Sequence, residues 1–108
     1  MGGYVLDSYI YDLWLKLKQC FSPAKQIQLI KYFKNAEGVY NAYAHDYFNL
    51  GLSDEQIIAL SDKNLSRAEA ELAKAKELGI GFVRFGDEYY PELLANIDSP
   101  PALLYAKG

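Results

Sequence analysis

Residues 65–85, LSRAEAELAKAKELGIGFVRF, change from one hydrophobic period to another within a single run. Up to Leu78 the apolar residues recur at helical spacing, and Gly79 stands where a helix commonly ends in a left-handed conformation. After that glycine, residues 80–85 alternate in the manner of a short strand. The sequence therefore predicts a helix over residues 63–78 that leads directly into a strand.

Upstream of this stretch, apolar residues at helical spacing predict further helices. Ser22 and Pro23 start one of them, because serine accepts a hydrogen bond from the first turn and proline lacks an N–H that a helix start leaves unpaired. Ser53 and Gln56 stand at capping-box spacing for a later one. The predicted helices before residue 63 span residues 10–21, 22–35, 36–43 and 53–60.

Downstream, a turn follows at Gly86, Pro91 opens a short helix, and residues 102–106 form a second apolar run. Strand, helix and strand in this order predict a βαβ unit with parallel strands and a right-handed crossover. Parallel strands need cover on both faces, so this pair indicates the opening of a larger sheet. The predicted fold class is mainly α, with a compact helical bundle over residues 1–78 and a truncated strand-helix-strand fragment over residues 79–108.

The composition is typical of a small folded domain, with 108 residues of which 51% are apolar and 23% charged. No apolar stretch approaches the roughly 18 residues of a membrane helix, and no signal peptide is recognisable. Cys20 is the single cysteine, so an intramolecular disulfide is excluded and a reducing compartment is expected. These features predict a cytoplasmic protein without membrane contact, and residue 108 is expected to be a cut within a longer chain.

Residues with catalytic chemistry are scarce. His45 is the single histidine and Cys20 the single cysteine, which excludes a zinc site built from four N and S ligands. The chain contains neither a Gly-x-x-x-x-Gly-Lys loop nor a Gly-x-Gly-x-x-Gly turn. We therefore expect no enzyme, no catalytic residue, no metal and no cofactor. A small enzyme or nucleotide-binding protein stays open as an alternative, supported only by the βαβ order.

The charge is unevenly distributed. The net charge is -3, with a pI near 5.0, which argues against binding nucleic acid by charge alone. Residues 10–36 nevertheless hold five lysines against one carboxylate, whereas residues 85–108 are acidic. The candidate phosphate contacts are Lys18, Lys25, Lys31 and Lys34, and the alternative is that these lysines are only the solvated faces of helices. For the ten tyrosines, packing within helices is favoured over stacking on bases.

The most specific pattern lies near the C-terminal end. A Tyr-Pro pair, apolar residues at helical spacing, a Pro-Pro pair and a Leu-Leu-Tyr run precede a glycine: Tyr90, Pro91, Leu94, Ile97, Pro100, Pro101, Leu103, Leu104, Tyr105 and Gly108. This pattern resembles the segment that leads into the main domain of the DNA-processing protein A family (DprA, also called Smf). Residues 21–42 are similar to that family's small N-terminal domain, which is SAM-like with helix-hairpin-helix character. The C-terminal motif residues are expected to set the backbone.

The resemblance implies a protein that binds single-stranded DNA and helps to load a RecA-type recombinase during natural transformation, the competence-linked route of DNA recombination. It also implies that residues 79–108 open a Rossmann-like domain, and that the family's main DNA-binding and dimer surfaces lie beyond Gly108. The helical part is then expected to be an auxiliary interaction module, with a regulatory protein as a further possible partner. The alternative is a pure protein–protein interaction domain without DNA contact.

The helical part departs from a DNA-gripping helix-hairpin-helix at its turn. Such a turn is usually rich in glycine, because its backbone N–H groups approach a phosphate. Here Phe21, Ser22 and Pro23 occupy the position, and the proline removes one N–H. Backbone capture of a phosphate is therefore not expected at this turn, and any DNA contact must come from side chains.

Overall fold

The structure is a computed structural model, and it describes residues 8–98 and 100–107. Seven helices and two strands are present in these residues. In chain order they are α2 (Ile10–Lys16), α3 (Pro23–Phe33), α4 (Ala36–Asn41), α5 (Ala44–Tyr47), α6 (Asp54–Ser61), α7 (Ser66–Leu78), β1 (Ile80–Arg84), α8 (Glu92–Ala95) and β2 (Leu103–Lys107). The predicted mainly α class is confirmed.

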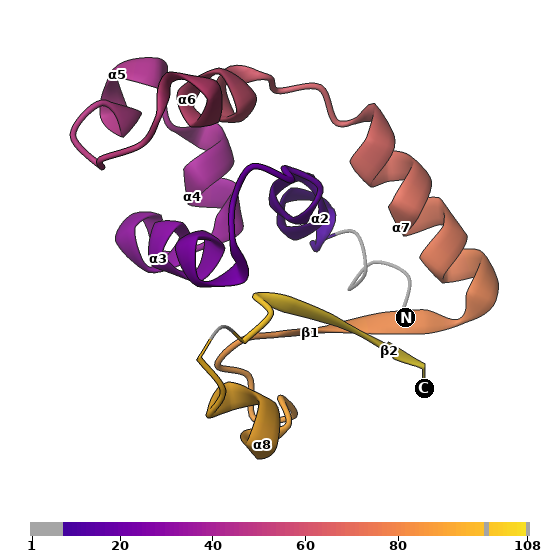
Figure 1. The fold of residues 1–108 in the computed structure, drawn as a ribbon. Coiled ribbons are helices and arrows are strands. Elements are labelled where there is room, and N and C mark those ends of the chain that lie inside the picture. The colour runs from indigo at the N-terminus through magenta and orange to yellow at the C-terminus, as the bar shows by residue number, and fades with distance from the viewer. Residues whose placement is uncertain (1–7, 99, 108) are drawn as a thin grey trace.

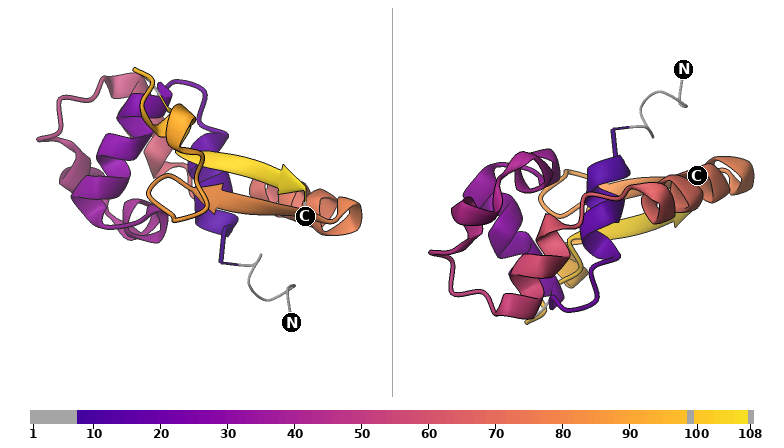
Figure 2. Two further views of the ribbon diagram at one scale, coloured as in Figure 1. Left: turned by 90° about the horizontal axis from the view of Figure 1, so that it is seen from below. Right: turned by 90° about the horizontal axis from the view of Figure 1, so that it is seen from above.

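Helix α2 is the centre of the molecule. Helices α3 and α4 lie on one side of it, α7 lies on the other, and the strand pair runs beneath α2 and α7 (Figures 1 and 2). Leu13, Trp14 and Leu15 on α2 are each at most 2% exposed, and Asp12 is 8% exposed, so this helix is buried on most of its circumference. Phe82 of β1 and Leu103 of β2 belong to the same core cluster as these residues. Helices and strands therefore share one core.

The local helix signals agree with the sequence. The Ser22 side chain accepts from the backbone N–H of Lys25 at 3.1 Å, and Ser53 and Gln56 form the predicted capping box. Gly79 ends α7 with a φ of 68°, a left-handed conformation that glycine adopts without steric cost. The first helix is shorter than predicted, since α2 ends at Lys16.

The parallel pairing predicted for the two strands is wrong. Strands β1 and β2 pair antiparallel, with Phe82 opposite Tyr105. A parallel pair needs a crossover that returns the chain along the whole strand, about 17 Å for five residues. Helix α8 has four residues and spans only about 6 Å. The chain instead doubles back, and the Tyr90 hydroxyl ties the start of the connection to its end by donating to the Pro101 carbonyl oxygen at 2.7 Å.

The C-terminal motif residues form this connection and the second strand. Tyr90 is buried, and Pro91 immediately precedes α8 with a φ of -59°. Leu94 is half-buried on α8, Ile97 is 48% exposed, Pro100 is buried and Pro101 is half-buried. Leu104 and Tyr105 lie in β2, while Gly108 falls outside the described residues. The described motif residues therefore lie in the connection, on the short helix and in the second strand.

Among residues 8–98 and 100–107, no helix has the combination of length and apolar character that crossing a bilayer requires.

Candidate nucleic-acid interface

Helix α3 has one face fixed in the core and one face in solvent. Ile27 and Leu29 are buried, and the Gln26 side chain donates from Nε2 to the Leu15 carbonyl oxygen at 3.0 Å, which anchors α3 to α2. On the other side Gln28 and Lys31 are exposed. Because the anchored face fixes the rotation of the helix, the chain presents a defined polar face.

Three of the four candidate lysines lie along α3. Lys25 and Lys31 line one shallow surface hollow beside Gln28, and Lys31 and Lys34 line the adjoining cleft, so the three form a continuous surface. We call Lys25, Lys31 and Lys34 the α3 lysine face. Within the described part of the chain, no acidic group pairs with their ammonium groups. Their positive charge is therefore available to an outside anion.

Lys34 has an unusual backbone. It closes α3 with a φ of 80° and is the only described residue other than glycine with a positive φ. A side chain at such a φ costs about 1–3 kcal/mol. The next residue, Asn35, starts α4 by accepting from the Gly38 N–H at 2.7 Å, so Lys34 stands at a tight corner between two helices. This corner carries the last lysine of the α3 lysine face.

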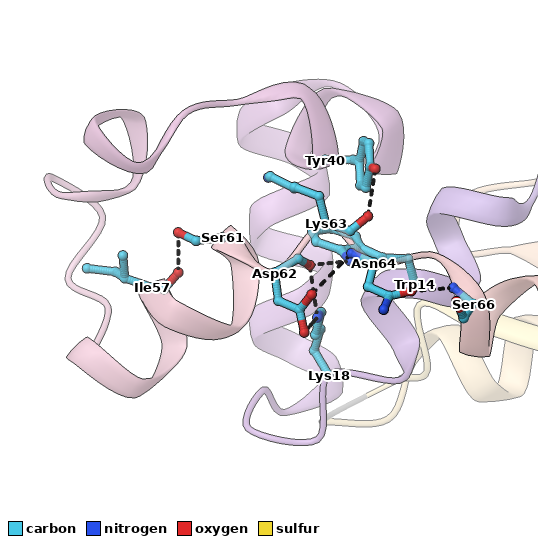
Figure 3. A network of polar contacts seen from close by, with 9 residues as sticks. All are labelled: Trp14, Lys18, Tyr40, Ile57, Ser61, Asp62, Lys63, Asn64 and Ser66. Carbon is cyan, nitrogen blue, oxygen red and sulfur yellow. Dashed lines mark hydrogen bonds and ion pairs between the residues drawn. The ribbon is translucent and has the colours of Figure 1, made fainter.

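Lys18 lies elsewhere, in the network drawn in Figure 3. Its Nζ donates to the Asp62 carbonyl oxygen at 3.2 Å, lies 3.9 Å from the Asp62 carboxylate and sits 5.1 Å from the centre of the Trp14 ring. Its side chain is 14% exposed. Lys18 holds the segment between α6 and α7 against α2, and the structure does not bring it together with the α3 lysine face.

The sequence does not identify Tyr32 as a candidate DNA contact, because it predicts that the tyrosines pack within helices. In the structure Tyr32 is 64% exposed and shares a hollow with Lys25 and Gln28. Tyr40 and Tyr47 do pack in that way. The spacing of positions 25, 28 and 32 repeats every three or four residues, which puts Tyr32 on the solvent side of α3 and would have identified it. The interface therefore combines lysines with an aromatic ring.

An ion pair between the buried Asp12 and the 39% exposed Arg84 side chain joins the helices to the strands behind this interface. Arg84 donates from Nε and Nη2 to one Asp12 oxygen at 3.1 and 3.0 Å, and its guanidinium carbon lies 4.1 Å from the centre of the Tyr9 ring. Burial raises the pKa of Asp12, and the hydrogen bond and charge of Arg84 oppose that rise. The pair fixes the end of β1 against α2.

Among the described residues, no three His, Cys, Asp or Glu side chains come together as a group that could hold a metal ion. His45 stacks on Tyr43 at the surface, and the half-buried Cys20 is distant from it in the chain. Comparisons with protein-family models, with curated proteins and with solved structures found no match to this chain. The functional argument therefore depends on the geometry of the α3 lysine face.

Proposed function

We propose that this chain is part of a DNA-processing protein similar to the DprA family, and that it binds single-stranded DNA and assists a RecA-type recombinase. In this proposal the helices are the SAM-like module, and residues 79–108 lead into the family's Rossmann-like domain. The α3 lysine face contacts the strand directly. The module is then more than an adaptor for protein partners.

The observation that carries the proposal is the α3 lysine face with Tyr32 beside it. Lys25 and Lys34 are nine positions apart, which corresponds to about 14 Å along a helix and suits a few nucleotides. Unpaired lysines bind phosphates without reading sequence, and an exposed ring stacks on any base. Both features suit a strand of arbitrary sequence.

The proposal is tested by fluorescence anisotropy with a labelled single-stranded oligonucleotide at several salt concentrations. Removing one lysine that contacts a phosphate is expected to lower the salt slope by about 0.7 for a single strand. The slope of log affinity against log salt concentration should therefore be smaller in magnitude by about 2 for the combined Lys25→Ala, Lys31→Ala and Lys34→Ala variant. Lys74→Ala, an exposed lysine on α7, is the matched control and should leave the slope unchanged. Equal slopes for the triple variant and the unchanged chain would refute the proposal.

A second candidate, a protein-interaction domain, is favoured by apolar side chains around α8. Tyr89 is 80% exposed, Leu93 86% and Ile97 48%, and α8 projects from the strand pair on the side away from α5 and α6 (Figure 1). Exposed apolar groups gathered in this way suit a partner surface. The oligonucleotide measurement separates the two candidates, because a pure interaction domain binds no DNA, and titration with a purified RecA-type recombinase tests the surface around α8. Leu93→Ser should weaken that complex and leave oligonucleotide affinity unchanged.

A further inference from the structure

A cleft of about 270 Å³ opens between the C-terminal end of α3, the start of α4 and the loop after β1. Ile27, Ile30 and Phe85 are among the residues that line it. The edge-to-face contact of Phe85 with Tyr90, at 5.3 Å between ring centres, holds that ring in position. The cleft thus has an apolar part that includes one aromatic ring held by a neighbouring ring.

Cations surround this aromatic surface. The Lys31 ammonium lies 5.9 Å from the centre of the Phe85 ring, and Lys34 lines the same cleft. Arg84 also lines it, but its charge is already balanced by Asp12, 3.0 Å away. Lys31 and Lys34 are therefore the two groups that can balance a phosphate at the mouth of the cleft.

We propose that this cleft binds a single nucleotide, with the base against Phe85 and the phosphate at Lys31 and Lys34. The cleft volume of about 270 Å³ lies just under the roughly 300 Å³ of the smaller sites for drug-sized ligands, so the base lies inside the cleft and the phosphate lies at its mouth. The source of the nucleotide rests on the proposed function: in a bound strand it is one residue of the DNA, and otherwise it is a free nucleotide.

Asp87 gives the cleft a preference among bases. One of its carboxylate oxygens, Oδ2, accepts from the Arg84 backbone N–H at 3.0 Å, which leaves the other oxygen to accept from a ligand. Adenine, cytosine and guanine carry an exocyclic amino group that donates to a carboxylate, and thymine carries none. The cleft therefore prefers these three bases to thymine.

The test is NMR titration of the ¹⁵N-labelled 108-residue chain with deoxyadenosine monophosphate, thymidine monophosphate, inorganic phosphate and a single-stranded oligonucleotide. The adenine nucleotide and the oligonucleotide should shift the amide signals of Lys34 and Gly86, and phosphate alone should bind more weakly. Phe85→Leu should lower the affinity for the adenine nucleotide about fivefold or more, which is the effect of losing one stacking contact. Phe48→Leu, the same change on a 62% exposed ring outside the cleft, should have no effect. Asp87→Asn should remove the preference over thymine.

The outcomes separate the cleft from the proposed function. Oligonucleotide binding that depends on Lys25 and ignores Phe85, with no nucleotide shifts in the cleft, overturns the cleft and leaves the proposed function standing. Nucleotide shifts in the cleft without oligonucleotide binding support the cleft as a free-nucleotide site and refute the proposed function. Absence of both kinds of binding overturns both. The shifts are measured on the unchanged chain, so they decide the question even where Phe85→Leu loosens the loop.

Discussion

Lys63 and Lys31 are the same residue type in opposite environments. The Lys63 ammonium lies 5.3 Å from the centres of three rings, and it donates to the Tyr47 hydroxyl at 2.9 Å. We call Trp14, Tyr40 and Tyr47 the aromatic cage of Lys63. Burial, followed by the charge of Lys18, lowers the pKa of Lys63. Lys31 is exposed and has one ring, Phe85, near its ammonium.

The difference shows how a lysine's neighbours decide what it can do. The aromatic cage supplies the cation–π contacts and the hydrogen bond that a ligand would otherwise supply to the Lys63 ammonium. Lys63 therefore stabilises the fold by holding the segment between α6 and α7. The α3 lysine face has no such cage within the described residues: Phe85, 5.9 Å from the Lys31 ammonium, is the one ring near it, so its charge remains for a ligand. Aromatic rings follow the same division, because Trp14 and Tyr47 are buried and Tyr32 is open. Stability and DNA affinity should therefore respond to different residues.

Trp14→Ala should give the largest loss of stability among the substitutions that test this comparison. It removes a cage ring, a core residue that is 2% exposed and the donor to the Asp62 carbonyl oxygen at 2.9 Å. Buried tryptophan truncations cost about 3–5 kcal/mol. Urea denaturation measures this loss. Tyr32→Ala is the matched aromatic control, and it should change stability by less than about 0.5 kcal/mol while lowering oligonucleotide affinity. Equal stability losses would show that the division is false.

Tyr47 gives the comparison a pH dependence. Burial, followed by the charge of Asp46, raises the pKa of Tyr47 from 10.0 to about 12. When folding raises the pKa of an acid, the folded state keeps its full stability at pH values below the pKa of the unfolded chain. That stability is lost as the pH rises from the unfolded pKa toward the folded pKa, because the unfolded chain ionises first. The loss should approach about 1.4 kcal/mol per pH unit between pH 10 and 12.

Tyr47→Phe isolates this effect. At pH 8 the variant should be less stable by about 1–3 kcal/mol, because the Val39 carbonyl oxygen loses the hydroxyl that donates to it at 2.6 Å. The difference between variant and unchanged chain should shrink as pH rises from 10 to 12. Urea denaturation at pH 8, 10 and 11.5 measures it. A constant difference across that range would contradict the environment assigned to Tyr47.

Lys63→Met sharpens the comparison at nearly constant side-chain volume. The methionine keeps contact with the cage but loses the cation–π attraction and the hydrogen bond to Tyr47, so stability should fall by about 1–2 kcal/mol. Oligonucleotide affinity should not change. Lys31→Met should give the reverse, with unchanged stability and weaker DNA binding at low salt. Fluorescence anisotropy measures the oligonucleotide affinity of both variants, and urea denaturation measures their stability. If both variants changed affinity and stability alike, the two lysines would not differ in role.

Signals that act within a few residues could be predicted from the sequence. Ser22, the Ser53–Gln56 capping box and Gly79 each satisfy backbone groups of a neighbouring turn, so their spacing is sufficient. Strand direction could not be predicted in this way, because it depends on how the whole connection after Arg84 folds, and the contact that closes it, from the Tyr90 hydroxyl to the Pro101 carbonyl oxygen, joins residues 11 positions apart. The candidate lysines show the same limit. The partner of Lys18 is Asp62, 44 positions away, and no local pattern separates Lys18 from Lys31.

Lys34→Gly separates backbone from charge at the corner between α3 and α4. The positive φ at this position suits glycine and strains lysine, so the substitution should stabilise the fold by about 1 kcal/mol. It also removes one cation of the α3 lysine face, so oligonucleotide affinity should fall. If Lys34 had only a structural role, a substitution that stabilises the fold would not be expected to weaken oligonucleotide binding. Lys34→Ala is the control, because it removes the charge and keeps the strain. A fall in affinity with both variants, and a gain in stability only with glycine, would assign the charge to the ligand and the strain to the corner.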